Sequence, residues 1–145
     1  MAFKLPETPK LAVDIVVNLK GSIVLIKRKF PPLGFALPGG FVDVGETVEN
    51  AAHRELKEET SLLARDMRLI GVFSEPDRDP RGHVVSIAYV ADAEGIPKAK
   101  DDAKELHIMT LSEALLTKMV IDHKNILIEA VRSFNAYLRK RGGRI

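Results

Sequence analysis

Cysteine is absent from the 145 residues of this sequence. Without it the chain cannot form disulfides, thiolate metal sites or a cysteine nucleophile, and a zinc ribbon held by cysteines is also excluded. An absence of cysteine fits a cytoplasmic protein, which is the location we expect.

The sequence also lacks any apolar run that approaches the roughly 20 residues needed to span a bilayer. Its first ten residues contain Pro6, Glu7 and Pro9 and have no apolar core of the kind found in signal peptides. We therefore expect a soluble protein with no membrane partner.

A strong excess of one charge is missing as well, because 22 basic residues face 20 acidic ones and the net charge is only +2. This near-balance does not favour a duplex nucleic acid partner. The basic residues between Arg139 and Arg144 are interpreted as a solvated helix end. With 46% hydrophobic and 29% charged residues, the composition predicts one globular domain over residues 1–145.

Apolar periodicity predicts an α/β (or α+β) domain in which strands outnumber helices. Gly21 marks the turn of a predicted hairpin, Phe30 to Gly40 is predicted as loop or irregular strand, and Gly95 to Asp102 as loop. The predicted strands are Leu11–Asn18, Ile23–Ile26, Met67–Phe73, His83–Val90 and Leu106–Met109. The predicted helices are Thr47–Thr60, Leu111–Leu116 with Thr110 or Ser112 as its cap, and the long amphipathic His123–Lys140.

Three carboxylates lie on one face of the first predicted helix: Glu55, Glu58 and Glu59 are three and four residues apart. Their charges repel one another, and Arg54 offsets this only in part. Magnesium prefers such oxygen ligands, and the bare backbone of Pro38-Gly39-Gly40 offers a carbonyl oxygen nearby. The alternative is a solvated helix whose glutamates only favour solubility.

The carboxylates belong to a longer pattern, GGFVDVGETVENAAHRELKEETSL from Gly39 to Leu62. This stretch resembles the Nudix box, G-x5-E-x7-R-E-U-x-E-E-x-G-U with U an aliphatic residue. Every position matches except the last glycine, where Ser61 stands. That glycine follows the helix, where a left-handed backbone is favoured. We therefore expect Ser61 either to form a different turn or to carry strain of ~1 kcal/mol.

The resemblance implies the Nudix fold, a mixed β-sheet sandwiched between α-helices, and a Mg²⁺ cofactor for which Mn²⁺ could substitute. By motif position it assigns roles to individual residues. Glu55, Glu59 and the Gly39 carbonyl would bind metal, and Glu58 would share a second metal or a bound water. Arg54 would orient the glutamates, while Glu46 and Gly40 would support the junction of loop and helix.

Outside the box, three segments resemble small ADP-ribose pyrophosphatases: Phe73–His83 with the strand after it, Asp101–Glu105 and Ile121–Leu127. Relatives commonly carry an aromatic pair after the acidic loop, where this chain has Ile108-Met109. In this context Arg78, Arg81 and Arg28 become candidates for contacts with phosphate or ribose, because guanidinium offers planar bidentate donors. The alternatives are a polar hairpin loop for the first two, a surface charge for Arg28 and a solvent-facing position for His83.

The expected activity is hydrolysis of a nucleoside diphosphate derivative, with ADP-ribose giving AMP and ribose 5-phosphate. Alternative substrates are nucleoside triphosphates, including oxidised ones, and dinucleoside polyphosphates. A nucleotide-sensing module without catalysis is a further alternative, although such modules tend to lose the glutamates that this chain retains.

Two further predictions concern the general base and assembly. The acceptor of the water proton is predicted to be Glu58 or a carboxylate of the later loop, with Asp102 and Glu105 favoured over Asp101. A homodimer is predicted because Leu11 to Val17 and the C-terminal helix are apolar. The alternative is that both segments pack into the core of one chain.

Overall fold

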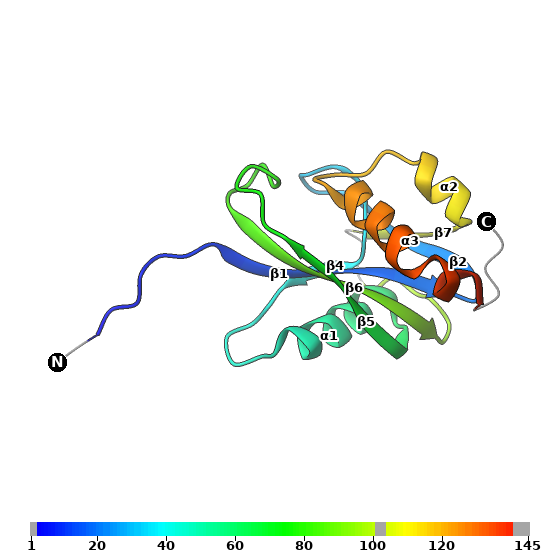
Figure 1. Ribbon diagram of the computed structural model, residues 1–145, viewed down its shortest axis with the longest axis horizontal. Helices are drawn as coiled ribbons and strands as arrows, with labels where there is room; N and C mark the ends of the chain where they lie inside the picture. The colour runs from blue at the N-terminus through cyan, green and yellow to red at the C-terminus, as the bar shows by residue number, and fades with distance from the viewer. Residues whose placement is uncertain (1–2, 101–103, 141–145) are drawn as a thin grey trace.

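In the computed structural model, described for residues 3–100 and 104–140, one mixed β-sheet lies between helices (Figure 1). The side chains of the described residues are placed as far as residue 135. The strands are β1 (Lys10–Leu19), β2 (Ser22–Arg28), β3 (Gly34–Ala36), β4 (Gly39–Phe41), β5 (Leu63–Phe73), β6 (Val84–Glu94) and β7 (Lys104–Met109). The helices are α1 (Val48–Thr60), α2 (Leu111–Leu116) and α3 (His123–Lys140). None of the described helices is long and apolar enough to cross a membrane.

Strand β1 lies at the centre of the sheet and sets the positions of its neighbours. It pairs in parallel with β6 over its whole length, from Lys10 opposite Val84 to Leu19 opposite Ala93. Its other edge pairs antiparallel with β4 at its start and with β2 at its end. Strands β3 and β7 pair with β2, and β5 pairs with β6. The strand that leads into the site, β4, is therefore held directly against the most buried strand of the sheet.

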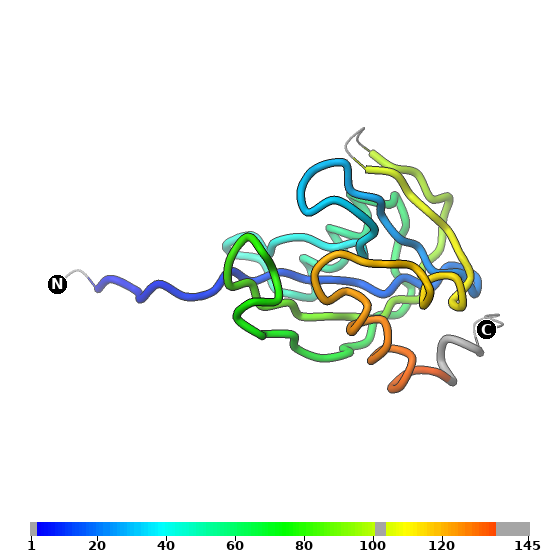
Figure 2. The backbone as a smooth tube through the Cα atoms, turned by 90° about the horizontal axis from the view of Figure 1, so that it is seen from above, coloured from blue at the N-terminus to red at the C-terminus, as the bar shows by residue number. Residues whose placement is uncertain are grey.

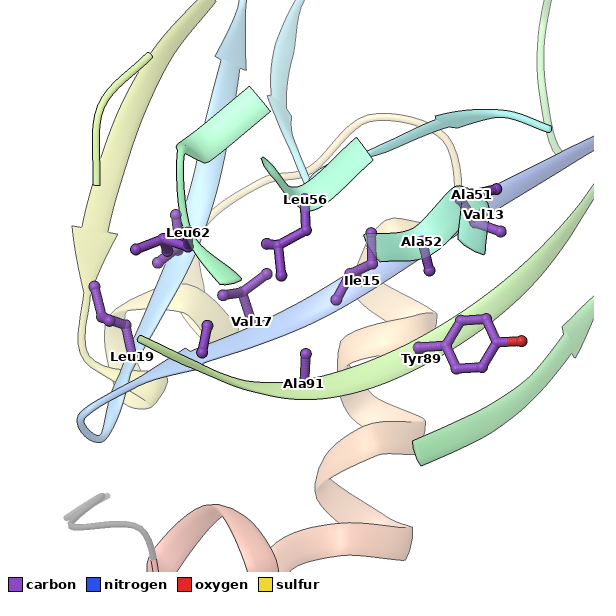
Figure 3. Packing of buried hydrophobic residues seen from close by; sticks show 12 residues of the cluster. Val13, Ile15, Val17, Leu19, Ala51, Ala52, Leu56, Leu62, Tyr89 and Ala91 are labelled. Carbon is purple, nitrogen blue, oxygen red and sulfur yellow. The ribbon is translucent and has the colours of Figure 1, made fainter. Parts of the chain in front are cut away.

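Both faces of the sheet carry an apolar core. On one face Val13, Ile15 and Val17 pack against Ala52 and Leu56 of α1, as Figure 3 shows. The other face packs under α2 and α3 through a second buried set: Val16, Ile23, Leu25, Leu37, Ile126, Leu127 and Ala130. Most of Leu11 to Val17 and of the apolar stripe of α3 is thus buried in the core of one chain. This burial is the alternative to the dimer surface that these segments suggested.

The helices begin where the sequence predicts. Thr47 caps α1 through its hydroxyl, which accepts the Asn50 N–H, and Thr110 caps α2 in a reciprocal capping box with Glu113. Helix α3 covers the predicted residues, with a kink at Phe134. Burial of Ala51, Ala52 and Leu56 fixes which face of α1 meets the sheet, so its glutamates lie toward β4 and solvent.

All five predicted strands are longer in the structure, and β5 and β6 each extend four residues beyond one predicted end. Strand β6 was predicted to end at Val90 but continues to Glu94, because Ala91 and Ala93 still pair with the buried end of β1. Strand β5 was predicted to start at Met67 but starts at Leu63, opposite Glu94. The added residues include small alanines and acidic residues, so they lack the apolar pattern by which a strand is predicted. Residues 3–9 extend away from the sheet (Figure 2).

Candidate active site

A cavity of about 360 Å³ opens beside α1 and β4. Predicted site residues from distant parts of the sequence line it together: Arg28, Gly39, Gly40, Glu55, Glu59, Arg78 and Arg81. The predicted residues Glu46, Arg54 and Glu58 lie behind or beside this lining. The fold therefore gathers most of the predicted site at one place.

The two glycines of β4 allow this close approach. A Cβ atom at Gly39 would lie 2.2 Å from the Val13 carbonyl oxygen, and one at Gly40 would lie 2.5 Å from the Glu55 carboxylate. The segment that was predicted as loop or irregular strand is in fact a short strand here, paired with β1. A side chain at Gly39 would therefore collide with the backbone of β1, and one at Gly40 would displace the Glu55 carboxylate, which the sequence predicts as a metal ligand.

Arg54 joins the acidic residues of the motif through its guanidinium group. It donates to Glu46 at 2.7 and 2.9 Å, to Glu55 at 2.8 Å and to Glu58 at 3.2 Å. It also donates to the Phe41 carbonyl at 3.1 Å. The hydrogen bonds from Arg54 lower the pKa of Glu46 to about 2, so this carboxylate stays ionised. The geometry fits the orienting role predicted for Arg54.

Glu55 and Glu59 are the most enclosed carboxylates of α1. Burial raises the pKa of Glu55, and the charge of Glu59 adds to the rise while Arg54 opposes it. Burial likewise raises the pKa of Glu59, against the lowering effect of Lys104. Glu59 accepts the Gly39 N–H at 2.7 Å and is paired with Lys104. Both groups are therefore held near the cavity at an electrostatic cost.

The donor set suits a hard divalent cation, since it combines carboxylate oxygens with a backbone carbonyl. Within residues 3–100 and 104–140, however, no three acidic or histidine side chains converge closely enough to hold a metal ion. Arg54 and Lys104 contact the carboxylates instead. A metal ion at this site would share the carboxylate oxygens with these two cations. Lys104 was not among the predicted residues, because the sequence does not reveal that β7 brings it to α1.

A buried polar network under the cavity was also missed. Leu37 donates its N–H to His123 Nδ1 at 2.9 Å, and His123 Nε2 lies 3.4 Å from Asp14 Oδ1. The other oxygen of Asp14 accepts the Ser86 hydroxyl at 2.5 Å. An aspartate inside the apolar run of β1 was the signal that could have indicated this network. The contacts tie α3 to the segment that leads into Gly39.

The three arginines predicted to contact substrate differ in their surroundings. Arg78 has a side chain that is only 3% exposed and donates to Asp122 at 2.9 and 2.5 Å. Arg81 is half-exposed and is bound by buried Asp79. Arg28 donates to the carbonyls of the Pro31-Pro32 turn. All three line the cavity, but Arg78 is primarily an anchor between the 74–83 loop and the start of α3.

The candidate general bases are placed unequally. Glu58 is exposed beside Arg54. Glu105 is also exposed, lies 3.8 Å from Lys29, and is not part of the cavity lining. Asp101 and Asp102 lie outside the described residues. His83 precedes β6 in an exposed position, with Nε2 3.1 Å from the Ser74 carbonyl, as the solvent-facing interpretation expected.

Ser61 takes the left-handed backbone that the motif's glycine favours, with φ of 64°. The expectation of a different turn is thus wrong, and the expectation of local strain applies. Its hydroxyl donates to the Lys98 carbonyl at 2.9 Å, so the side chain makes a contact that glycine lacks.

Comparison with known proteins agrees with this geometry. The NUDIX domain model matches residues 8–130. The chain belongs to the Nudix family. Among Nudix proteins, the ADP-ribose pyrophosphatase of Methanocaldococcus jannaschii is 50% identical over 127 residues, which are 86% of this chain and 74% of the relative.

Solved Nudix structures show the same fold. A MutT/nudix family protein from Enterococcus faecalis superposes with a TM-score of 0.81 at 32% identity, covering 94% of this chain and 66% of that one. A bifunctional NMN adenylyltransferase/ADP ribose pyrophosphatase from Francisella tularensis gives 0.70 at 27% identity, covering 93% and 43%. The predicted Nudix fold, a mixed sheet sandwiched between helices, is confirmed.

Proposed function

We propose that this Nudix protein is a Mg²⁺-dependent pyrophosphohydrolase that converts ADP-ribose into AMP and ribose 5-phosphate. The observation that carries the proposal is the contact of the bare Gly39–Gly40 backbone with Glu55 and Glu59 at one cavity wall. The names of the relatives from M. jannaschii and F. tularensis support ADP-ribose as the substrate.

The proposed metal ligands are Glu55, Glu59 and the Gly39 carbonyl, with Glu58 at the exposed side. Mg²⁺, or Mn²⁺ in its place, polarises the diphosphate and lowers the pKa of a bound water when it is present. Lys104 lies beside Glu59, so it is placed to pair with a substrate phosphate once the carboxylate binds metal. Water then attacks one phosphorus, and the other phosphate leaves with its charge neutralised.

Two arginines that line the cavity are proposed to orient the diphosphate. Arg28 and Arg81 are both lining residues and lie on different strands and loops of the cavity rim. Their planar donors suit phosphate oxygens. For the proton acceptor we retain Glu58, Asp102 and Glu105 as candidates, since a metal-bound water needs only a carboxylate within hydrogen-bond reach.

The cytoplasmic location and the homodimer stay predictions. Val13, Ile15 and Val17 are buried under α1, whereas Leu11 and Ile128 of α3 are exposed and could contact a partner subunit.

The test is a substrate panel with magnesium, comparing ADP-ribose with 8-oxo-dGTP, dATP and diadenosine polyphosphates. ADP-ribose should have the highest kcat/KM, and a tenfold advantage for any of the others would overturn the assignment. Glu55→Gln and Glu59→Gln should each lower turnover by several orders of magnitude, since removing a ligand leaves the metal under-coordinated. Glu49→Gln is the matched control, because Glu49 is exposed on the same helix and does not line the cavity.

A further inference from the structure

Phe41 and Arg81 form a ledge at the mouth of the cavity. Phe41 ends β4 and is 43% exposed. The Arg81 guanidinium carbon lies 5.4 Å from the centre of its ring. Both residues line the cavity and also a second, more open hollow of about 640 Å³ that includes Lys10 and His83.

The ledge is rigidly supported on the arginine side. Asp79 is only 3% exposed, yet both of its oxygens are used by Arg81, at 3.1 and 2.8 Å from the side chain. It also accepts the Arg81 backbone N–H at 2.9 Å. A buried carboxylate with bidentate contacts fixes the plane of the guanidinium group. The face that Arg81 presents to the ring is therefore held in place before any ligand arrives.

The backbone of Phe41 is held by the network around the catalytic carboxylates. The Phe41 carbonyl accepts from the same Arg54 that holds Glu55 and Glu46. Phe41 and Glu55 line the same cavity. A group attached to a diphosphate bound beside Glu55 can therefore reach the ledge.

The cavity lining comes from strands that neighbour β1 at different places. Phe41 is opposite Ala12 and Gly39 is opposite Asp14, and farther along β1 the strand β2 takes over as its partner from Val17. Besides the ledge, β2 and β3 contribute Ile26 and Ala36 to the lining, and these two residues are paired across the two strands.

The two parts of the lining differ in exposure. Ile26, Ala36 and Leu37 are almost fully buried and offer a ligand little surface. The ledge is more open: the Phe41 ring lies against the half-exposed Arg81 guanidinium group, and the Asp43 carboxylate, also in the lining, is 72% exposed. An open site with one ring and two charged edges suits a sugar, whose C–H face packs on the ring and whose hydroxyls bind polar groups.

We propose that the Phe41–Arg81 ledge binds the terminal sugar of a nucleoside diphosphate sugar, which makes Phe41 a specificity-determining residue. This inference rests on the proposed function and adds to it the place of the non-nucleotide half of the substrate. In ADP-ribose that half is the ribose 5-phosphate unit.

The test exploits the absence of tryptophan from the sequence. Phe41→Trp places one emitting indole on the ledge, and ribose 5-phosphate and AMP are titrated separately, without turnover. Ribose 5-phosphate should change the emission saturably, whereas AMP at equal concentrations should not. Phe3→Trp is the control for nonspecific effects, because Phe3 is 88% exposed and outside both hollows.

Inhibition constants give a second readout that does not depend on the indole. Phe41→Leu should raise the inhibition constant of ribose 5-phosphate and the KM for ADP-ribose by about tenfold, as expected when a contact in a binding pocket is removed. The inhibition constant of AMP should stay within twofold. Arg81→Lys, which keeps the charge but loses the planar contact with Asp79, should also raise the inhibition constant of ribose 5-phosphate. Because Arg81 is proposed to orient the diphosphate as well, only Phe41→Leu is used to compare the two products.

The opposite pattern, an AMP-dependent emission change with a raised AMP constant, would overturn the assignment by placing the base on the ledge. Unchanged constants for both products would show that the ledge binds neither half. The wild-type substrate panel is measured separately. Failure to hydrolyse ADP-ribose would contradict the proposed function, whereas the product titrations test on their own whether the ledge binds the sugar.

Discussion

The most instructive perturbation is at His123, which supports the glycine segment from behind. Its Nδ1 accepts the buried Leu37 N–H at 2.9 Å, so the proton of the neutral ring is on Nε2, facing Asp14 at 3.4 Å. Leu37 is two residues before Gly39, the proposed carbonyl ligand. We predict that the Nδ1 acceptor, rather than the ring itself, keeps Gly39 in register with Glu59.

Two substitutions separate the ring nitrogens. The amide oxygen of Asn occupies roughly the place of Nδ1, and the amide of Gln roughly that of Nε2. His123→Gln therefore leaves the buried Leu37 N–H without an acceptor, which costs about 2 kcal/mol of unfolding free energy. At roughly 4 °C per kcal/mol for a chain of this size, Tm should fall by about 8 °C. A displacement of Gly39 by about 1 Å should lower kcat about a hundredfold.

His123→Asn keeps an acceptor for Leu37 and loses only the long contact with Asp14. Its kcat should stay within about tenfold of the wild type, even though the smaller side chain also reduces stability through a cavity. The assay is kcat and KM on ADP-ribose at saturating magnesium, with urea unfolding in parallel. Equal losses of kcat in the two variants, or a fully active Gln variant, would refute the reasoning.

Further predictions concern pH, the general base and assembly. Arg81 holds the pKa of Asp79 below its usual range, so their pair stabilises the fold above the unfolded-state value of about 4 and loses this effect as pH falls through the lower folded value. The stability deficit of Asp79→Asn in urea should therefore be largest at pH 7 and shrink toward pH 2. Asp102→Asn or Glu105→Gln should lower kcat strongly if that residue is the general base. If these two variants and Asp101→Asn all keep more than about a third of the wild-type kcat, Glu58 becomes the leading candidate. Sedimentation at micromolar concentration should show a dimer, and a species of only 16.0 kDa would contradict it.

The elements with strong periodicity could be predicted from the sequence, and those set by distant partners could not. Helix α3 has the predicted bounds because an apolar stripe and flanking polar residues specify it locally. Strand β4 is different: Gly39 and Gly40 have no side chain that signals a strand, and only the pairing with Ala12 to Asp14 creates it. The same holds for the end of β6, which its alanines do not mark.

At the site, the motif on one continuous stretch predicted the carboxylates and Arg54, since a helix brings residues four apart onto one face. Lys104 and His123 could not be predicted in the same way, because each reaches the site through a tertiary pairing between elements far apart in the chain. The sequence correctly predicted that Arg78 lies at the site. Its buried ion pair with Asp122 could not be predicted, because it depends on the packing of α3.

The left-handed Ser61 has a consequence for how the family's motif is written. The serine adopts φ of 64° and bonds the Lys98 carbonyl, so in this chain serine meets the backbone requirement that glycine meets in the motif. A search pattern that demands glycine there would reject this chain although every acidic position is present. Ser61→Gly should relieve about 1 kcal/mol of backbone strain and lose a hydrogen bond of similar worth. The net change in unfolding free energy should therefore be close to zero, which urea unfolding of the variant would measure.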